Sequence, residues 1–464
     1  MTVHSSTRDG ARDPLAAAAG SRASAGDAGG LRPVHAWGTV AILTLANVFG
    51  FLDRIILSYL VKPLRRDFAL TDTEVSLLMG LSFTIFYSLL GLPIGRWVDR
   101  GSRPRIIALG VAVWSLLTAV TGFARSFAQL FAARIGVGVG EATLGPAAVS
   151  LIADTFPRRG LAIAMSVYQM GSFTGAGLAY AVGAFAVGRL DVPGRLVLPW
   201  GAEIYPWQTV FFWVGLPGLL VALLALFIRE PRREAASAQA REVPVPVREV
   251  LRYMRANGRT IGALSFGFAC SLSVNLGVAS WLPTFLDRTH GWTIAQAGLL
   301  QGALTFFIGP IGVLAGGRLT DAWGKRGMVD APLRVGMVGA LGMLVCAGIY
   351  PLVPAVPVVV ALLVAVNVFA ALPWGAASAA VAEAMPPRMR GQGSAVYQLI
   401  VNLVAGVLGP TAVALLTDRV FGDPQAIRYS LSVLAVAAMS CTLLLLGWAR
   451  PAYVRTVQAM RDAG

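Results

Sequence analysis

The chain has 464 residues, of which 56% are hydrophobic and only 13% are charged. So few charged residues cannot cover the surface of a soluble domain of this length, and the composition therefore excludes a soluble globular protein and indicates a membrane protein. The net charge of +15 does not indicate a nucleic-acid partner, because the basic residues lie in short connections between apolar runs and not on one amphipathic face.

Twelve apolar runs follow one another along the chain, each close to the roughly 20 residues that a helix needs to cross a bilayer. Before them, residues 1–35 are rich in Ala, Gly, Ser, Arg and Asp, lack the apolar stretch of a secretory signal, and are predicted to be a disordered cytoplasmic tail. The predicted helices are 36–61, 73–97, 105–124, 128–153, 160–188, 207–228, 260–286, 294–317, 333–352, 355–381, 390–417 and 427–449, followed by a second cytoplasmic tail at 450–464.

The longest polar connection, residues 229–259, follows the sixth predicted helix and divides the chain into two blocks. We expect it to be a cytoplasmic linker between an N-terminal six-helix bundle, residues 36–228, and a C-terminal six-helix bundle, residues 260–449. Of the 38 Lys and Arg residues, 27 lie in the tails and the even-numbered connections and nine in the odd-numbered connections. Because basic residues gather on the cytoplasmic side, both termini are predicted to be cytoplasmic.

An internal repeat relates the two blocks. The sequence GRWVD at residues 95–99, after the second predicted helix, recurs as GRLTD at residues 317–321, after the eighth, with an offset of 222. The sequence VYQ at residues 167–169 recurs at residues 396–398 with an offset of 229. Matches at a fixed offset and at equivalent places in the two blocks indicate two halves of common design.

Residues 95–105, with the sequence GRWVDRGSRPR, resemble the signature connection between the second and third helices of major facilitator transporters. The resemblance implies an all-α membrane protein with twelve transmembrane helices in two pseudo-symmetric six-helix bundles, acting as a secondary transporter. It also implies that Asp99 faces the N-terminal end of helix eleven, where the helix dipole stabilises a carboxylate and the contact holds the cytoplasmic gate shut. The implied gating residues are Gly95, Arg96, Asp99, Arg100, Gly101 and Arg103, with Asp321 and Arg326 in a weaker second copy.

Two further segments resemble the spinster-like branch of this superfamily, whose animal members export lysolipids and sphingoid phosphates. They are NVFGFLDR at residues 47–54, in the first predicted helix, and RIGVGVGEA at residues 134–142, in the fourth. The general family resemblance covers nearly the whole chain beyond residue 35, whereas the branch assignment depends mainly on these two segments. A bacterial member need not share the animal substrates.

Four charged residues lie inside predicted helices: Asp53 and Arg54 in the first, and Arg134 and Glu141 in the fourth. An ionisable side chain within the bilayer is costly unless it is paired or hydrated, so each of them is a candidate functional residue. Arg134 and Glu141 are seven residues apart and therefore return to one face of their helix, two turns apart. The C-terminal half has no charged residue at an equivalent depth.

These charges have two interpretations. They either form ion pairs that only fix the packing of helices one and four, or they couple transport to protons. Desolvation strengthens a carboxylate's hold on its proton and a nearby guanidinium weakens it, so a substrate that competes for the arginine changes the proton affinity. We expect Asp53 to carry the proton, Glu141 to be the second titrating group, and Arg54 and Arg134 to partner the carboxylates or an anionic substrate. Three carboxylates beyond the first helix are predicted to be solvated and outside the site: Asp67, Asp72 and Glu74.

Uncharged polar residues inside predicted helices are weaker candidates for substrate contacts, because hydrogen bonding between helices explains each of them equally well. As a set they indicate which helix faces line the cavity. These residues are Asn47, Tyr168, Gln169, Asn275, Asn367, Tyr397, Gln398 and Asn402.

A charged N-terminal half facing an apolar, aromatic C-terminal half suits an amphiphile with an anionic head. We therefore predict proton-coupled export of a lysolipid-like or other amphipathic organic anion across a bacterial inner membrane, by rocking of the two halves. One alternative is a proton symporter that imports a small organic acid or sugar acid, held by Arg54. An alternative of another class is a membrane sensor or scaffold that does not transport.

The sequence predicts no enzymatic activity, cofactor or metal. The three histidines, His4, His35 and His290, lie in predicted tails or loops, the three cysteines are scattered through apolar runs, and no nucleotide-binding loop is visible. The expected partners are the anionic substrate, protons and the lipid bilayer, and the chain is expected to act as a monomer.

Overall fold

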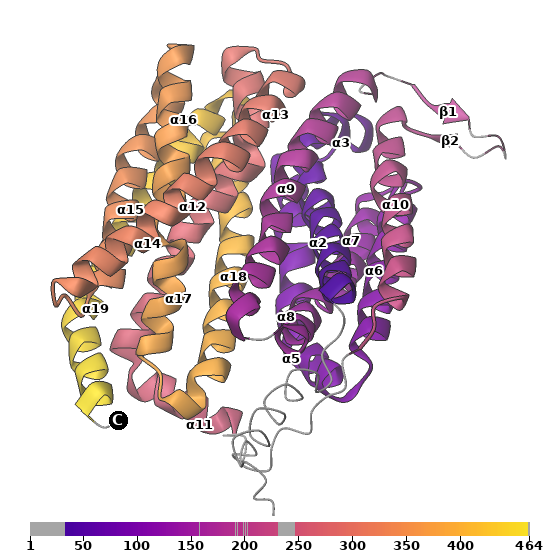
Figure 1. Cartoon of the computed structure of the whole chain (residues 1–464). Coiled ribbons are helices and arrows are strands. Elements are labelled where there is room, and N and C mark those ends of the chain that lie inside the picture. The colour runs from indigo at the N-terminus through magenta and orange to yellow at the C-terminus, as the bar shows by residue number, and fades with distance from the viewer. Residues whose placement is uncertain are drawn as a thin grey trace, which may run out of the picture.

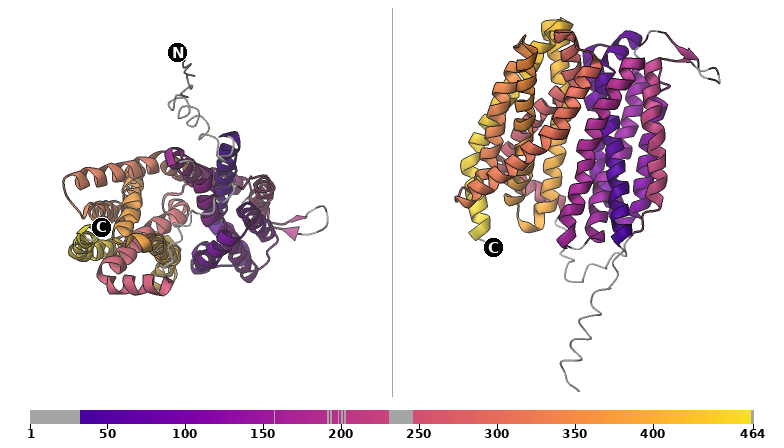
Figure 2. Two further views of the ribbon diagram at one scale, coloured as in Figure 1. Left: turned by 60° about the horizontal axis from the view of Figure 1, so that its bottom comes forward. Right: turned by 45° about the horizontal axis from the view of Figure 1, so that its top comes forward.

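The computed structural model describes residues 33–462, except residues 157, 191, 193, 198, 200, 202 and 231–245. The predicted N-terminal tail up to residue 32 and about half of the predicted linker therefore lie outside the described residues. The described chain is almost entirely helical, and its helices form two bundles that lie side by side (Figures 1 and 2).

The N-terminal half has helices at all six positions predicted for it (Figure 1, indigo to magenta). A short helix, α3 (Val61–Phe68), joins the first two, and strands β1 (Leu196–Val197) and β2 (Glu203–Ile204) form an antiparallel hairpin before the sixth. The membrane helices are α2 (Pro33–Ile56), α4 (Asp72–Ser76) continued by a π-helical turn into α5 (Ser82–Arg100), α6 (Arg103–Thr121), α7 (Phe127–Glu141) with α8 (Leu144–Thr155), α9 (Arg158–Leu190) and α10 (Thr209–Leu226).

The C-terminal half repeats this arrangement (Figure 1, pink through orange to yellow) and is preceded by the short helix α11 (Val247–Ala256). Its membrane helices are α12 (Gly258–His290), α13 (Ile294–Ala303) continued into α14 (Gly309–Lys325), α15 (Ala331–Ile349), α16 (Val356–Ala371) with α17 (Pro373–Glu383), α18 (Arg390–Leu415) and α19 (Ile427–Asp462).

Eleven helical segments among the described residues are long and apolar enough to cross a membrane, by length and composition. They occupy eleven of the twelve predicted positions, and α9, with 33 residues, occupies the remaining one. The predicted all-α fold of two six-helix bundles is confirmed.

Two helices continue through the repeated motif that was predicted to follow them. α5 runs to Arg100 and α14 to Lys325, so residues 95–99 and 317–321 form the last turns of helices and not connections. The turn that follows α5 is short, because Ser102 already precedes the first residue of α6.

The predicted C-terminal tail is also helical as far as Asp462. Tyr453 and Val457 are buried in it, and the Tyr453 hydroxyl donates a hydrogen bond to Glu383 at 3.0 Å. Packing against α17 therefore extends α19 beyond the part that the bilayer requires.

The two halves pack closely at the end of the molecule opposite the C-terminus, which we call the closed end (Figure 1). There α9 packs against α13, and α18 packs against the segment from α4 to α5. Small residues permit this approach: Gly302 lies opposite Gly177, and a Cβ on Gly80 would overlap the carbonyl oxygen of Gly406.

Charged side chains join the halves at the closed end. The fully buried Asp72 carboxylate accepts hydrogen bonds from Arg65 of its own half and from Arg288 of the other half, the latter at 2.6 and 2.9 Å. Asp418 of the C-terminal half accepts two hydrogen bonds of 2.7 Å from Thr73, one from the amide at the start of α4, where the helix dipole favours a carboxylate. We call these four charged residues, Arg65, Asp72, Arg288 and Asp418, the clasp.

The prediction that Asp72 is a solvated loop residue is wrong, because docking of α12 covers the start of α4. Asp67 is also largely covered, and it accepts hydrogen bonds from Arg66 and Trp207. Burial raises the pKa of Asp67, but these hydrogen bonds outweigh that effect and hold the pKa below its ordinary value.

The contact between Gly80 and Gly406 predicts the effect of a single methyl group. In Gly80→Ala the added Cβ meets backbone that cannot move alone, so the closed end should open in a larger fraction of molecules. Spin labels at the exposed positions Arg125 and Ala355, one on each half, should then report longer distances.

Gly91→Ala is the matched control for that measurement, because a Cβ on Gly91, further along the same membrane segment, has open space around it. Identical distance distributions in the two variants would show that the glycine contact does not hold the halves together.

Candidate functional site

The four charged residues inside the membrane helices form two ion pairs between α2 and α7. Asp53 lies 2.8 Å from Arg134 and also accepts a hydrogen bond of 2.8 Å from the Thr118 hydroxyl of α6. The side chains of Asp53 and Arg134 are only 1% and 2% exposed. Both oxygens of Asp53 are therefore occupied, and this pair is closed to solvent.

The second pair differs in its exposure and its bonding. Arg54 Nε lies 2.6 Å from Glu141 Oε2, but the Arg54 side chain is 28% exposed while that of Glu141 is 2% exposed. The other Glu141 oxygen, Oε1, is buried and has no hydrogen-bond partner in the described chain. The pair therefore combines an accessible cation with a buried carboxylate that retains one free oxygen.

Aromatic rings hold the Arg54 guanidinium in place. Its central carbon lies 4.7 Å from the ring centroid of Phe83, 4.6 Å from that of Tyr87 and 5.1 Å from that of Phe51. Cation–π contacts of this kind stabilise a positive charge that is partly removed from water. Arg54 therefore keeps its charge and position even when its carboxylate partner is engaged elsewhere.

Glycines in α7 bring these groups together. A Cβ on Gly138 would lie 2.7 Å from the carbonyl oxygen of Phe83, and one on Gly140 would lie 2.9 Å from that of Gly110. Only glycine permits such close contact between backbones, so α7 lies directly against α5 and α6. This contact brings Glu141 and the ring of Phe83 to the same group, the guanidinium of Arg54.

The chemistry available to this arrangement is ion exchange coupled to proton transfer. An anion that binds Arg54 removes the counter-charge from Glu141, and a buried carboxylate without a cation favours its neutral form. The Asp53 and Arg134 pair lacks such an opening and has the character of a structural pair, although the role predicted for Asp53 stays a prediction.

The uncharged polar candidates divide into packing contacts and exposed groups. Asn47 donates hydrogen bonds to the Tyr168 carbonyl at 3.1 Å and to Ser172 at 3.0 Å, so it joins α2 to α9. Asn367 donates to the Leu363 carbonyl of its own helix.

Of the remaining candidates, Tyr168 lies within electrostatic range of Arg54 and Tyr87, and no contact in the described chain brings the others to the charged pairs. Tyr168 and Tyr397 are buried among apolar residues, Asn275 is half-buried, and Gln169 and Gln398 are exposed. Gln398 and the half-buried Asn402 form a hydrogen bond of 3.2 Å with each other on α18.

The predicted gating motif is described only in part. Gly95, Arg96, Asp99 and Arg100 lie in the last turns of α5, and their side chains are outside the described part of the structure. The gating role implied for Asp99 therefore stays a prediction. Gly101 ends α5, and its amide donates to the Trp97 carbonyl.

Arg103 fastens the turn after α5 to its own half. Its side chain is 1% exposed and pairs with Asp154 at the end of α8 and with Glu230 beyond α10, the latter at 3.0 Å. Burial raises the pKa of Glu230, but the hydrogen bonds from Arg103 outweigh that effect and lower it below its ordinary value. In the second copy, Asp321 and Arg326 are both exposed, without this anchoring.

The site contains residues that sequence reasoning missed. Thr118 completes the shell of Asp53, and Phe83 and Tyr87 surround Arg54. A hydroxyl in an apolar run is a weak signal, because most such groups bond to their own helix. The spacing of four between Phe83 and Tyr87 was a usable signal, since it places both rings on one helix face.

The different bonding of the two pairs predicts different costs of breaking them. Asp53→Asn leaves the buried Arg134 without a counter-charge and should lower the free energy of unfolding by about 3–5 kcal/mol. Glu141→Gln should cost less, because Arg54 is partly exposed and keeps its aromatic contacts. Thermal unfolding of the purified variants measures the order of these effects.

The double variant Asp53→Asn with Arg134→Gln is the control for that experiment. It removes both charges and should recover part of the stability that Asp53→Asn loses. Equal destabilisation by Asp53→Asn and Glu141→Gln would contradict the distinction between a structural pair and an accessible pair.

The model of the Major Facilitator Superfamily matches residues 43–410. An MFS-type efflux pump of Mycolicibacterium smegmatis is 28% identical over 434 residues, covering 91% of this chain and 94% of that protein. A probable L-galactonate transporter of Escherichia coli is 26% identical, covering 68% of each chain. A crystal structure of a bacterial homologue of the human lysosomal transporter spinster, inward-facing and unoccupied, is 27% identical, with a TM-score of 0.77 over 93% of this chain and 99% of that chain.

Proposed function

The chain belongs to the Major Facilitator Superfamily, and we propose that it exports an amphipathic organic anion across the bacterial inner membrane by proton-coupled alternating access. As a member of this family it is a multi-pass membrane transporter of small molecules and not an enzyme. The similarity to a spinster homologue confirms the predicted resemblance to the spinster-like branch. The proposed substrate is accordingly lysolipid-like or sphingolipid-like.

This proposal depends on one observation. The accessible Arg54 guanidinium pairs with the buried Glu141 carboxylate, and only one oxygen of that carboxylate has a hydrogen-bond partner in the described chain. We propose that the anionic head of the substrate displaces Glu141 from the guanidinium and that Glu141 then takes up a proton. Departure of the substrate returns Arg54 to Glu141 and releases the proton. Bound substrate raises the affinity for the proton, and the bound proton raises the affinity for the substrate by the same factor. Transport of the two is therefore coupled whichever way the cycle runs.

The shape of the molecule supports alternating access. The closed end is held by the clasp and by glycine contacts, and the fold matches that of a protein solved in an inward-facing conformation. We therefore propose that the closed end faces the periplasm. Asp99 and its neighbours, at the opposite end, are proposed to close that end when the halves rock.

Import of a small organic acid or sugar acid is the second candidate. Mutual stabilisation of anion and proton favours movement of both in the same direction, and inward movement draws on the proton gradient. The similarity to a probable L-galactonate transporter supports a sugar acid as cargo. In export, the gradient of the substrate itself drives the movement of both.

Flux through reconstituted liposomes tests the proposal and its direction. With a fluorescent lysolipid and a sugar acid as separate cargoes, wild type should move one of them together with protons, which a pH-sensitive dye records. In Glu141→Gln, accumulation of cargo driven by a pH gradient should fall by at least about tenfold, because a neutral amide cannot exchange a proton. Exchange of cargo across the membrane should be retained. Glu249→Gln, an exposed change on α11, is the matched control.

Asp53→Asn separates the two proton assignments in the same assay. If it abolishes uphill movement while Glu141→Gln transports normally, the proton is carried on α2, as the sequence predicts. If neither variant changes coupling, both pairs only hold helices together. Absence of flux for every cargo tested, with intact folding, would favour a sensor or scaffold.

The proposed orientation predicts which loops react with a reagent that cannot cross the membrane. A cysteine replacing the exposed Arg326, between α14 and α15, should react only from the cytoplasmic side, and one replacing the exposed Ala355, before α16, only from the periplasmic side. The opposite pattern in intact cells would invert the topology and the direction assigned to the closed end.

A further inference from the structure

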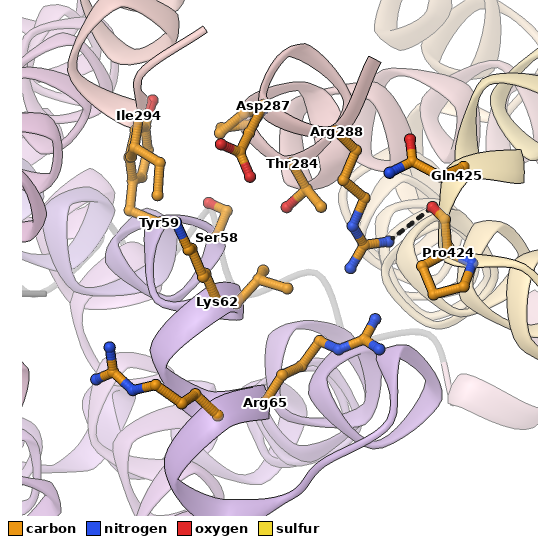
Figure 3. A pocket seen from close by; sticks show the side chains of 13 residues that line it. Ser58, Tyr59, Lys62, Arg65, Thr284, Asp287, Arg288, Ile294, Pro424 and Gln425 are labelled. Carbon is orange, nitrogen blue, oxygen red and sulfur yellow. Dashed lines mark hydrogen bonds between the residues drawn. The ribbon is translucent and has the colours of Figure 1, made fainter. Parts of the chain in front are cut away.

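A cavity of about 410 Å³ lies at the closed end, between the two halves, and is distinct from the charged pairs inside the membrane (Figure 3). The N-terminal half contributes the segment from Ser58 to Arg66, and the C-terminal half contributes the end of α12, the start of α13 and the turn before α19. Its volume is within the range of small-molecule sites.

Four cations line this cavity: Lys62, Arg65, Arg66 and Arg288. One carboxylate, Asp287, lines it as well. Two further carboxylates bind three of the cations from behind, since Asp72 pairs with Arg65 and Arg288 and Asp67 pairs with Arg66. Among the described residues, the lining and the ion-pair partners named here therefore carry one more positive charge than negative charge.

Lys62 and Arg288 line the cavity from opposite halves. Lys62 is exposed and forms no ion pair within the described chain, and in Figure 3 it lies across the cavity from Thr284 and Arg288. Arg288 is held in position by Asp72 and by the Pro424 carbonyl at 3.2 Å. The hydroxyls of Ser58, from the N-terminal half, and of Thr284, from the C-terminal half, add neutral polar groups to the lining.

We propose that this cavity is an anion-binding site, which takes a carboxylate or phosphate group between Lys62 of one half and Arg288 of the other. The proposal goes beyond the transported substrate and its proton, and it does not depend on them. Because the two cations lie on different halves, the site exists only while the closed end is shut.

A bound anion must therefore stabilise the closed state, since a ligand shifts a conformational equilibrium toward the state that binds it. It adds a bridge between the halves beside the clasp and delays opening at this end. The anion is either a free solute, such as phosphate, or the phosphate of a lipid head group, and both present the same chemistry to Lys62 and Arg288.

Distances between spin labels at positions 125 and 355 test the proposal in the full chain with its native cysteines replaced. In phosphatidylcholine nanodiscs at constant ionic strength, inorganic phosphate should increase the closed population saturably. Replacing part of the lipid by phosphatidylglycerol, without phosphate, tests the head group as ligand. Lys62→Gln should raise the half-saturating phosphate concentration about fivefold to tenfold.

Arg195→Gln is the matched control, because it removes one exposed positive charge from the hairpin, outside the cavity lining. An increase in the closed population with phosphate, with phosphatidylglycerol or with both supports the site and identifies its ligand, provided that Lys62→Gln weakens this increase and Arg195→Gln does not. No shift in either arm, or one that Lys62→Gln leaves unchanged, overturns the proposal. This readout is independent of flux, so its failure leaves the proposed transport function untouched.

Discussion

The structure depends on the rule that a charge removed from water needs a partner. In the membrane interior this rule brings Asp53 to Arg134 and Glu141 to Arg54, and so fixes how α2 lies against α7. The glycines of α7 and the hydroxyl of Thr118 serve the same end, because they allow backbones and side chains close enough to complete the two pairs. Helix packing and the chemistry of the site are therefore consequences of one constraint.

The same rule acts between the halves at the closed end, with a different result. Asp72 has no exposure and is shared by a guanidinium from each half, so separating the halves removes one of its two partners. Inside the N-terminal half, by contrast, both members of each membrane pair lie in the same bundle. On the proposed rocking mechanism, the contacts that break lie at the closed end, and the contacts that persist lie within one bundle.

Sequence reasoning was sufficient for the helices because each one needs a long apolar run, and such runs are visible without knowing the fold. It also found all four membrane charges, since a charge in an apolar run is conspicuous. It failed where tertiary docking decides the environment. Asp72 reads as a helix start in water, and its partner Arg288 is 216 residues away, so only the docking of the halves reveals the clasp. Thr118 was missed for the same reason.

The difference between the two membrane pairs bears on why a transporter would carry both. A pair that is saturated on both oxygens, as at Asp53, resists hydration and gives the bundle a fixed frame. A pair with one free oxygen and one accessible cation, as at Glu141 and Arg54, is less stable alone but able to respond to an arriving anion. Arg54 follows Asp53 directly on α2, so the fixed pair also holds the backbone from which the Arg54 side chain reaches Glu141. On the proposed mechanism, the fixed pair keeps the guanidinium in place while the carboxylate exchanges its cation for a proton.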